Sequence, residues 1–303
     1  MKYRRLGKTG IKVSVMGVGT WQFGGQWSKD FTQDDANAIL SRARELGVNL
    51  IDTSACYGPD HMSETLIGGF LKDDNREDWV IATKFGHKHG GWTPDAVRAT
   101  LEDSLRVLGT DYVDIYQFHS GSNEAFDTPG LWEMLAEQVE AGKVRCVGNS
   151  VGSNDNLHQV AASTERGIST IQIIYNRIDR KPEAEVFPSC IEQDLGVLAR
   201  VPLASGFLSG KYTPDAKFAE GDVRANRDPE FVRRQIEEAL RVKETEVPEG
   251  VEMATWALAW CLQHPAVSCV IPGCKSVAQV ESNAAAADLT DMVRDDHSQA
   301  WSG

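Results

Sequence analysis

Short apolar runs alternate with amphipathic stretches from one end of this chain to the other. Residues 13–19 (VSVMGVG) are almost all apolar and predict a buried strand, whereas residues 32–47 (TQDDANAILSRARELG) carry apolar side chains at helical spacing. Thr32 followed by Asp35 is typical of the capped start of a helix, and Gly47 is typical of its end. The pattern therefore opens with one strand followed by one helix.

This strand-then-helix unit recurs until eight units have been counted. We expect the other strands at 48–52, 79–84, 112–118, 143–149, 168–175, 196–204 and 266–273, and the other helices at 62–72, 94–108, 129–142, 153–166, 184–196, 254–265 and 276–287. Eight such units without a linker favour an α/β fold with a single (β/α)8 TIM barrel as one domain, residues 1–303. A doubly wound sheet is the competing α/β arrangement.

Two segments fall outside the repeating pattern. Residues 2–14 (KYRRLGKTGIKVS) have the character of an N-terminal β-hairpin, which we expect to close the bottom of the barrel. A long loop insertion at about 205–247 follows the seventh strand and is rich in charged and turn residues. We expect it to cover a bound cofactor partly, with Asp222 and Arg224 as clasp residues; the alternative is a surface excursion without such contact.

Composition narrows the class of partner. The chain has 303 residues, 41% hydrophobic and 25% charged, and a formal net charge of −13, which argues against nucleic acid or an anionic membrane as the main partner. No run approaches the roughly 18 apolar residues of a membrane helix. The six cysteines show no CxxC pairing, and the N-terminus lacks an uninterrupted apolar segment. Reduced thiols and a cytoplasmic location are therefore expected.

Ionisable side chains stand at the ends of three consecutive predicted strands. Asp52 ends the second strand, Lys84 the third and His119 the fourth, while Tyr57 lies in the loop just after the second. The carboxyl ends of barrel strands meet on one face, so these four should converge there. Taken singly, each residue also has an interpretation without catalysis. Asp52 could cap a helix, and Lys84 could be a solvated charge. His119 could be an ordinary loop histidine, and Tyr57 could serve packing alone. Their joint occurrence favours a catalytic site.

The chemistry of this set is specific. A free tyrosine has a pKa near ~10, and a neighbouring lysine ammonium should lower the pKa of Tyr57 toward neutrality. Asp52 would keep Lys84 charged and aimed, and His119 would share the substrate oxygen. We expect a proton donor beside a developing alkoxide, which suits carbonyl reduction.

The motifs IDTSACYG, SETLIGGFL, IATKFG and DIYQFH (from residues 51, 63, 81 and 114) resemble those of the aldo-keto reductase family, and IQIIYNRIDR, PLASGFLSGKY and VIPGCKSVAQVESN continue the resemblance downstream. It covers nearly the whole chain in the right order. It implies Tyr57 as general acid with Asp52, Lys84 and His119 as its partners. It also implies a nicotinamide cofactor bound without a Rossmann domain, NADP(H) in most members, with NAD(H) possible.

Further contacts carry over from the same resemblance. Cofactor contacts are implied at Gly19, Thr20, Trp21, Asp52, Ser150, Gln172, Asn176, Arg200, Pro202, Leu203, Ser205, Leu208, Ser209, Lys211, Gly273, Lys275, Gln279 and Asn283. Lys275, at the start of the last helix, would meet a 2′-phosphate. The substrate pocket should draw on Trp21, Tyr57, His119 and Trp92, together with Phe23 and His87.

Two positions depart from the family pattern. Val151 replaces an asparagine near the carboxamide, so recognition there should rely on Ser150 and Gln172. Arg200 stands where an aromatic residue commonly stacks on nicotinamide. Its positive charge should favour the reduced, neutral ring over the oxidised cation.

Two other motifs give little functional information. Residues 17–25 (GVGTWQFGG) miss the GxGxxG spacing, and His87 with His89 lacks a third ligand, so no metal is expected. The leading function is NAD(P)H-dependent reduction of small carbonyl compounds by a monomer or small homo-oligomer. The alternatives are NAD-dependent oxidation of a polyol or sugar alcohol, and a cofactor-binding regulatory subunit like the potassium-channel β subunits of this family.

Overall fold

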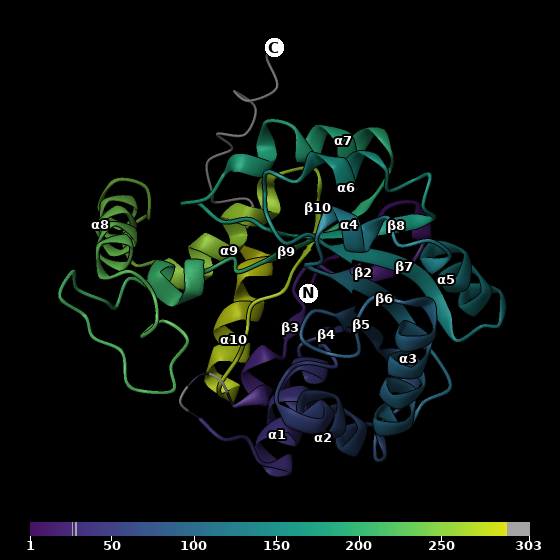
Figure 1. The fold of residues 1–303 in the computed structure, drawn as a ribbon. Helices are drawn as coiled ribbons and strands as arrows, with labels where there is room; N and C mark the ends of the chain where they lie inside the picture. Colours follow the sequence, from purple (N-terminus) through teal and green to yellow (C-terminus); the bar gives the residue numbers. More distant parts are fainter. Residues whose placement is uncertain (26, 28, 290–303) are drawn as a thin grey trace.

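A computed structural model describes residues 1–25, 27 and 29–289 of the chain. Eight parallel strands follow one another in sequence order around a central axis (Figure 1). They are β3 (Val18–Gly19), β4 (Leu50–Asp52), β5 (Val80–Gly86), β6 (Val113–His119), β7 (Val144–Ser150), β8 (Ile168–Ile174), β9 (Gly196–Arg200) and β10 (Val267–Val270). Parallel bridges between Met16 and Val270 and between Gly19 and Gly273 join the first strand to the last. The predicted (β/α)8 barrel is confirmed.

Helices cover the outside of the strands (Figure 1). They are α1 (Gln33–Glu45), α2 (Met62–Leu71), α3 (Pro94–Leu108), α4 (Asn123–Phe126), α5 (Leu131–Glu140), α6 (Leu157–Ala161), α7 (Val186–Glu192), α9 (Met253–Gln263) and α10 (Val277–Ala285). The predicted cap of α1 is present as a reciprocal pair, because the Thr32 hydroxyl accepts from the backbone N–H of Asp35 and the Asp35 carboxylate accepts from that of Thr32. The helix expected at 153–166 is much shorter, since only 157–161 are α-helical. Among the described residues, no helix is long and apolar enough to cross a membrane.

The N-terminal hairpin is present and corrects one predicted strand. β1 (Tyr3–Arg5) pairs with β2 (Lys12–Ser14) in an antiparallel sheet of two strands. The strand expected at 13–19 is therefore divided: its first residues belong to the hairpin and its last to β3 of the barrel. Three apolar side chains of the hairpin segment, Leu6, Ile11 and Val13, pack in one cluster with apolar residues from six of the barrel strands or their ends. The hairpin thus closes the bottom of the barrel, as expected.

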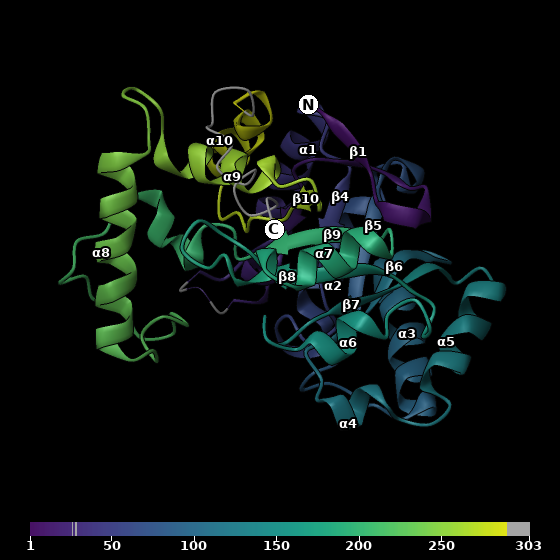
Figure 2. The ribbon, with the colours of Figure 1, turned by 90° about the horizontal axis from the view of Figure 1, so that it is seen from above.

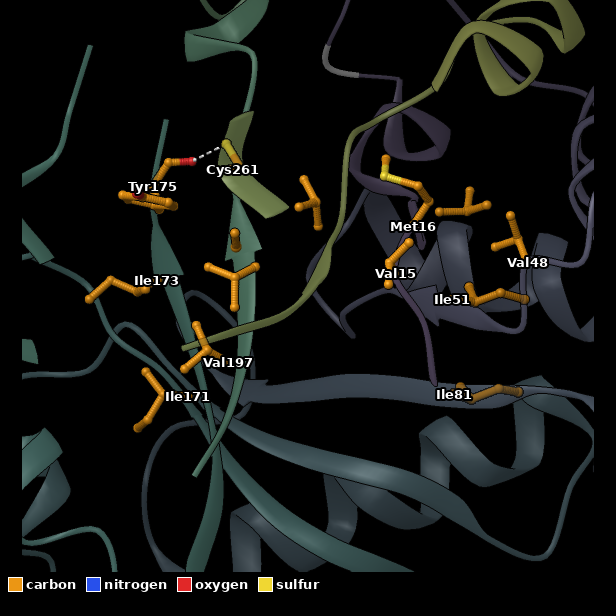
Figure 3. Packing of buried hydrophobic residues seen from close by; sticks show 14 of the residues in the cluster. Val15, Met16, Val48, Ile51, Ile81, Ile171, Ile173, Tyr175, Val197 and Cys261 are labelled. Carbon is orange, nitrogen blue, oxygen red and sulfur yellow. Dashed lines mark hydrogen bonds between the residues drawn. The ribbon is translucent and has the colours of Figure 1, made fainter. Parts of the chain in front are cut away.

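Side chains alternate along each strand between the barrel interior and the helices. Ile51, Ile81, Ile171 and Val197 belong to the large cluster between strands and helices, and Figure 3 shows them among its members. The residues beside them, Leu50, Val80, Ala82 and Leu198, fill the lower interior. Two residues further along each strand, the same inward direction leads to the top of the barrel. This period of two decides which side chains reach the site.

The insertion between β9 and α9 is partly helical. A short 3-10 segment (Ala204–Ser209) follows β9, and an irregular segment then leads to α8 (Pro229–Thr245). α8 stands apart from the ring of helices in both views (Figures 1 and 2). The insertion therefore lies beside the carboxyl end of β9.

Candidate active site

The four ionisable residues come from neighbouring strands. β4 pairs with β5 and β5 with β6, so the strands that carry Asp52, Lys84 and His119 lie side by side. Asp52 lies two residues beyond the interior Leu50, and Lys84 two beyond the interior Ala82. Both side chains therefore point into the top of the barrel. The loop after β4 returns Tyr57 to the same place.

Lys84 joins the carboxylate to the phenol. Its Nζ donates to Asp52 Oδ2 at 2.7 Å, to the backbone oxygen of Thr53 at 2.6 Å and to the Tyr57 hydroxyl at 3.1 Å. An ammonium has three N–H donors, so this geometry uses all of them. Burial opposes the charge, but attraction to Asp52 and Tyr57 outweighs it, so the pKa of Lys84 is raised. The lysine is held as a cation although its side chain is wholly buried.

Two glutamines complete the shell around Asp52. Gln172 Nε2 donates to Asp52 Oδ1 at 2.6 Å and to Gln117 Oε1 at 3.1 Å, and Gln117 Nε2 reaches the same Oδ1 at 3.3 Å. The Ser150 hydroxyl donates to Gln172 Oε1 at 3.3 Å. Gln117 was not among the predicted site residues. Its signal was available, because it lies two positions before His119 and so shares its face of β6.

The ionisation of Tyr57 differs from the expectation. Burial raises the pKa of its phenol, and the opposing attraction to Lys84 does not overcome that effect. The expectation that Lys84 brings the pKa of Tyr57 down toward neutrality is therefore wrong for the protein alone, because the sequence pattern does not show how completely the phenol is enclosed. Tyr57 carries its proton at neutral pH.

His119 is held as a neutral ring. Burial lowers the pKa of His119 well below its usual value, and the charges of Lys84 and Arg200 lower it further. Its ring meets the Tyr57 ring edge-on with centroids 5.9 Å apart, and the His87 ring lies 4.8 Å away. The centre thus combines a protonated phenol, a cation and a neutral imidazole.

A cavity extends from Tyr57 across the carboxyl ends of β3, β8, β9 and β10 to the insertion and α10. Predicted residues that line it are Gly19, Trp21, Asp52, Tyr57, Gln172, Arg200, Pro202, Leu203, Ser205, Ser209, Lys211, Gly273, Lys275, Gln279 and Asn283. Lining residues that were not predicted are Gln22, Trp27, Val201, Gly206, Tyr212, Ala254, Ile271, Pro272 and Ser282. Most of the unpredicted lining residues either come directly after a predicted residue in the sequence or lie in loops. In a loop no strand pattern indicates which way a side chain points.

The remaining predicted residues lie outside this lining. Thr20 donates its hydroxyl to the backbone oxygen of Asp52, Leu208 is fully buried, and Asn176 holds the backbone of its own loop. Trp92, expected in the substrate pocket, packs against Phe118 with ring centroids 4.4 Å apart. Ser150, Lys84, His119, His87 and Phe23 are also absent from the lining.

Three polar atoms of the cavity wall are buried without a hydrogen-bond partner among the residues that the structure describes. They are Gln22 Oε1, Trp27 Nε1 and Arg200 Nε, one acceptor and two donors. Buried polar groups are normally paired, so unpaired ones indicate a missing water or ligand. Gly273 packs directly against the Gln22 amide, where a Cβ would lie about 2 Å from it. The unpaired wall atoms, in a cavity that extends from Tyr57 to α10, fit an elongated polar ligand such as a nicotinamide dinucleotide.

The insertion covers one part of this cavity. The backbone of Asp222 forms an isolated antiparallel β-bridge with that of Trp27. Both carboxylate oxygens of Asp222 accept hydrogen bonds from Arg224, at 2.9 and 2.7 Å. The Arg224 guanidinium also reaches the Tyr212 hydroxyl at 2.8 Å and lies over the Trp27 ring. Asp222 and Arg224 therefore connect the insertion to the loop after β3.

Cations gather at the same end. Lys211, Arg224 and Lys275 line the cavity, and Arg227 donates to the Ser205 hydroxyl at 2.8 Å. Lys275 Nζ donates to the backbone oxygen of Trp27 at 2.6 Å, just before α10. The chain as a whole carries a net charge of −13, so this is a local reversal of sign. It suits a phosphate-bearing ligand.

Comparison with known proteins agrees with this geometry. A family model described as the aldo/keto reductase family matches residues 15–300. The NADH-specific methylglyoxal reductase of Escherichia coli strain K12 is 32% identical over 313 residues, which cover 95% of this chain and 94% of that protein. The aldo-keto reductase YhdN of Bacillus subtilis strain 168 is 31% identical, with 93% and 87% covered. The holo form of aldo-keto reductase AKR11C1 from Bacillus halodurans superposes with a TM-score of 0.76 at 28% identity, over 98% of this chain and 99% of that one.

Proposed function

The chain belongs to the aldo/keto reductase family, and we propose that it reduces small aldehydes and ketones to alcohols with Tyr57 as the proton donor and NADPH as the preferred reductant. The observation that carries this assignment is the hydrogen bond of 3.1 Å from Lys84 to the Tyr57 hydroxyl at the end of the cavity. A phenol that keeps its proton at neutral pH and is bound to a cation is suited to protonate an alkoxide.

The chain's own residues perform the proton transfer. Tyr57 gives its proton to the carbonyl oxygen, and the Lys84 ammonium stabilises the phenolate that remains. Asp52 and its glutamine partners keep that ammonium in place, since its other hydrogen bonds go to Asp52 and Thr53. The neutral His119 ring lies beside the phenol, where it can contact the same substrate oxygen. The bound dinucleotide supplies the hydride.

The choice between NADPH and NADH rests on the cationic end of the cavity. Lys275 and Arg224 would hold a 2′-phosphate there, with Lys211 nearby. The name of the E. coli relative specifies NADH for that protein, so binding is the decisive measurement. We expect NADPH to bind more tightly than NADH in a fluorescence titration, and Lys275→Met to reduce the difference. Equal affinity for the two cofactors would contradict the preference for NADPH.

The proposed substrate class follows from the relatives. Methylglyoxal, named for the E. coli relative, is the first compound to test, followed by simple aldehydes and, in reverse, a polyol with NAD⁺. We expect carbonyl-dependent loss of NADPH absorbance, abolished in Tyr57→Phe while NADPH binding persists. If only polyol oxidation is observed, or if Tyr57→Phe retains full turnover, the proposal is wrong.

We further propose that residues 1–303 act as one domain, as a monomer or small homo-oligomer that does not bind nucleic acid. All six cysteines are free thiols, which supports the expected reducing compartment, the cytoplasm.

A further inference from the structure

One ring nitrogen of His119 faces away from solvent toward the loop that carries Tyr57. Nδ1 lies 3.1 Å from the Ser54 hydroxyl and 3.7 Å from the Cys56 thiol. In the described part of the chain, the hydrogen bonds of His119 side-chain atoms all use Nδ1. Ser54 is 1% exposed and His119 is 8% exposed. The Ser54–Nδ1 contact is therefore shielded from bulk water.

The other partners of Ser54 limit what its hydroxyl can do. Its oxygen accepts the backbone N–H of Cys56 at 3.4 Å, an interaction in which the amide can only donate. The Cys56 sulfur lies 3.3 Å from the same oxygen. A hydroxyl has one donor and two acceptor sites, so its proton has two possible acceptors, Nδ1 and the Cys56 sulfur.

The two tautomers of a neutral imidazole can be compared on this basis. If Nδ1 carries the proton, it donates to Ser54, and the serine proton must go to sulfur, a weak acceptor. If Nε2 carries the proton, Ser54 donates to the bare Nδ1, a strong acceptor, while the amide and the thiol of Cys56 both donate to the serine oxygen. The second arrangement gives the Ser54 hydroxyl a stronger acceptor and the Cys56 thiol an acceptor, while the Cys56 amide keeps the same partner.

The geometry points to Ser54 as a positioning residue that donates to Nδ1 of His119 and thereby fixes the tautomer with the proton on Nε2. This rests on the proposed function, because it gives His119 a donor and not an acceptor at the ring nitrogen left for the substrate. A bare Nε2 would repel a developing alkoxide and compete for the Tyr57 proton. With Nε2–H, the imidazole and the phenol both donate to the same oxygen.

Side-chain ¹⁵N NMR of the cofactor-free, full-length protein tests the tautomer without turnover. The chain has seven histidines, so the His119 signals are identified by their loss in His119→Asn. We expect a bare Nδ1 and a protonated Nε2 in the wild type, the same pattern in Cys56→Ala, and a mixture of tautomers in Ser54→Ala. A protonated Nδ1 in the wild type would overturn the inference.

Turnover provides the second arm. Ser54→Ala should lower kcat about tenfold with unchanged affinity for NADPH, and Ser54→Thr, which keeps the hydroxyl, should recover most of that loss. Cys56→Ala should stay within about twofold of the wild type. A Ser54→Ala protein that keeps both the wild-type tautomer and the wild-type kcat refutes the role of Ser54. If no carbonyl compound is reduced by the wild type, the proposed function fails, while the NMR spectra still decide the tautomer.

Discussion

Two buried carboxylates, Asp52 and Asp114, are held by basic groups near opposite ends of two strands of this barrel, β4 and β6, which flank β5. Asp52 is the last residue of β4 and binds Lys84, while Asp114 is the second residue of β6 and binds Arg76 at 2.8 Å and Arg145 at 2.5 Å. Both are shielded from solvent. Their surroundings differ, because the lysine bound to Asp52 also donates to the Tyr57 hydroxyl, which lines the cavity. Asp114 accepts from the backbone of Ile81 and from two arginines, and Arg76 also donates to the backbone oxygens of Trp79 and Tyr112.

The difference teaches that position along a parallel strand separates a carboxylate beside the proposed proton donor from one with a structural role. Carboxyl ends of barrel strands open to the cavity, and amino ends face the closed side. Asp114 also shares the outward parity of Tyr116 and Phe118, which pack in the outer cluster. Burial and ion pairing alone do not distinguish the two residues, but the end of the strand and the face of the sheet do.

The largest expected effect follows from a change at Asp52. Asp52→Asn keeps the shape but removes the charge that holds Lys84 as a cation beside Tyr57, so kcat for carbonyl reduction should fall by about 10³-fold. Steady-state assays with saturating NADPH check this, with fluorescence titration to confirm that the cofactor still binds. If kcat falls less than about tenfold, Asp52 is not part of the proton-donating unit.

The matching change at the other end should affect stability and not turnover. Asp114→Ala leaves Arg76 partly buried without its acid and removes the acceptor of the Ile81 amide, so the free energy of unfolding should fall by about 3 kcal/mol. Urea unfolding measures the loss, and kcat of the folded variant should equal that of the wild type. An unchanged midpoint of unfolding, or a large loss of kcat, would remove the distinction between the two ends.

The arginines near the two ends of the barrel differ in their partners. Arg76 shares the Asp114 carboxylate with Arg145. Arg200 has no acidic partner in the described part of the chain and donates to the backbone oxygen of Val151. In the proposed reaction the nicotinamide ring would lie near Tyr57, which shares its cavity with Arg200. Arg200→Met should therefore lower the ratio of the NADP⁺ and NADPH dissociation constants by about tenfold, since an unpaired cation disfavours the oxidised ring.

Fluorescence titration of both cofactor forms measures this ratio. Lys275→Met is the matched control, because a phosphate contact should weaken both forms by the same factor. A ratio that stays at its wild-type value in Arg200→Met contradicts the electrostatic explanation.

The smallest expected effect is the pH dependence of reduction. In the proposed mechanism Tyr57 acts in its protonated form. Burial raises its pKa above the ordinary 10.0, so the phenol keeps its proton until the solution is more alkaline than that. The same mechanism uses His119 as a neutral ring, and its lowered pKa keeps it neutral above its ordinary 6.5. From about pH 7 to about pH 9 kcat should be constant. The measurement is kcat as a function of pH in buffers of constant ionic strength. A change of kcat with pH inside that window would show that another ionisable group controls the step.

Sequence reasoning succeeded where a residue's place follows from periodicity. The order of eight units, the cap at Thr32 and the strand ends at Asp52 and His119 all depend on local spacing, which the chain displays directly. Lys84 was expected to end its strand, but β5 continues for two residues to Gly86. The direction of the pKa shift of Tyr57 was wrong because it depends on how completely distant segments of the chain enclose the phenol. The split of residues 13–19 was missed because an apolar run does not show which sheet each half joins.

Loop residues were the least predictable part of the site. Trp27 and Tyr212 line the cavity from segments without regular structure, and their inward direction depends on the contacts of Asp222 and Arg224. Trp92, predicted beside the substrate, is half-buried and packs against Phe118 with ring centroids 4.4 Å apart. Its contact with substrate stays a prediction.

The seam of the barrel, where β3 meets β10, has a thermodynamic consequence. These strands are joined by isolated bridges and not by a continuous ladder, and Gly19 and Gly273, which form one bridge, both line the cavity. A dinucleotide lying across them would tie the first strand to the last. Resistance to heat and to amide exchange at this seam should then depend on cofactor supply, by about 2.7 kcal/mol when the free cofactor is a hundred times its dissociation constant. The stability of the fold would thus depend on the concentration of free cofactor.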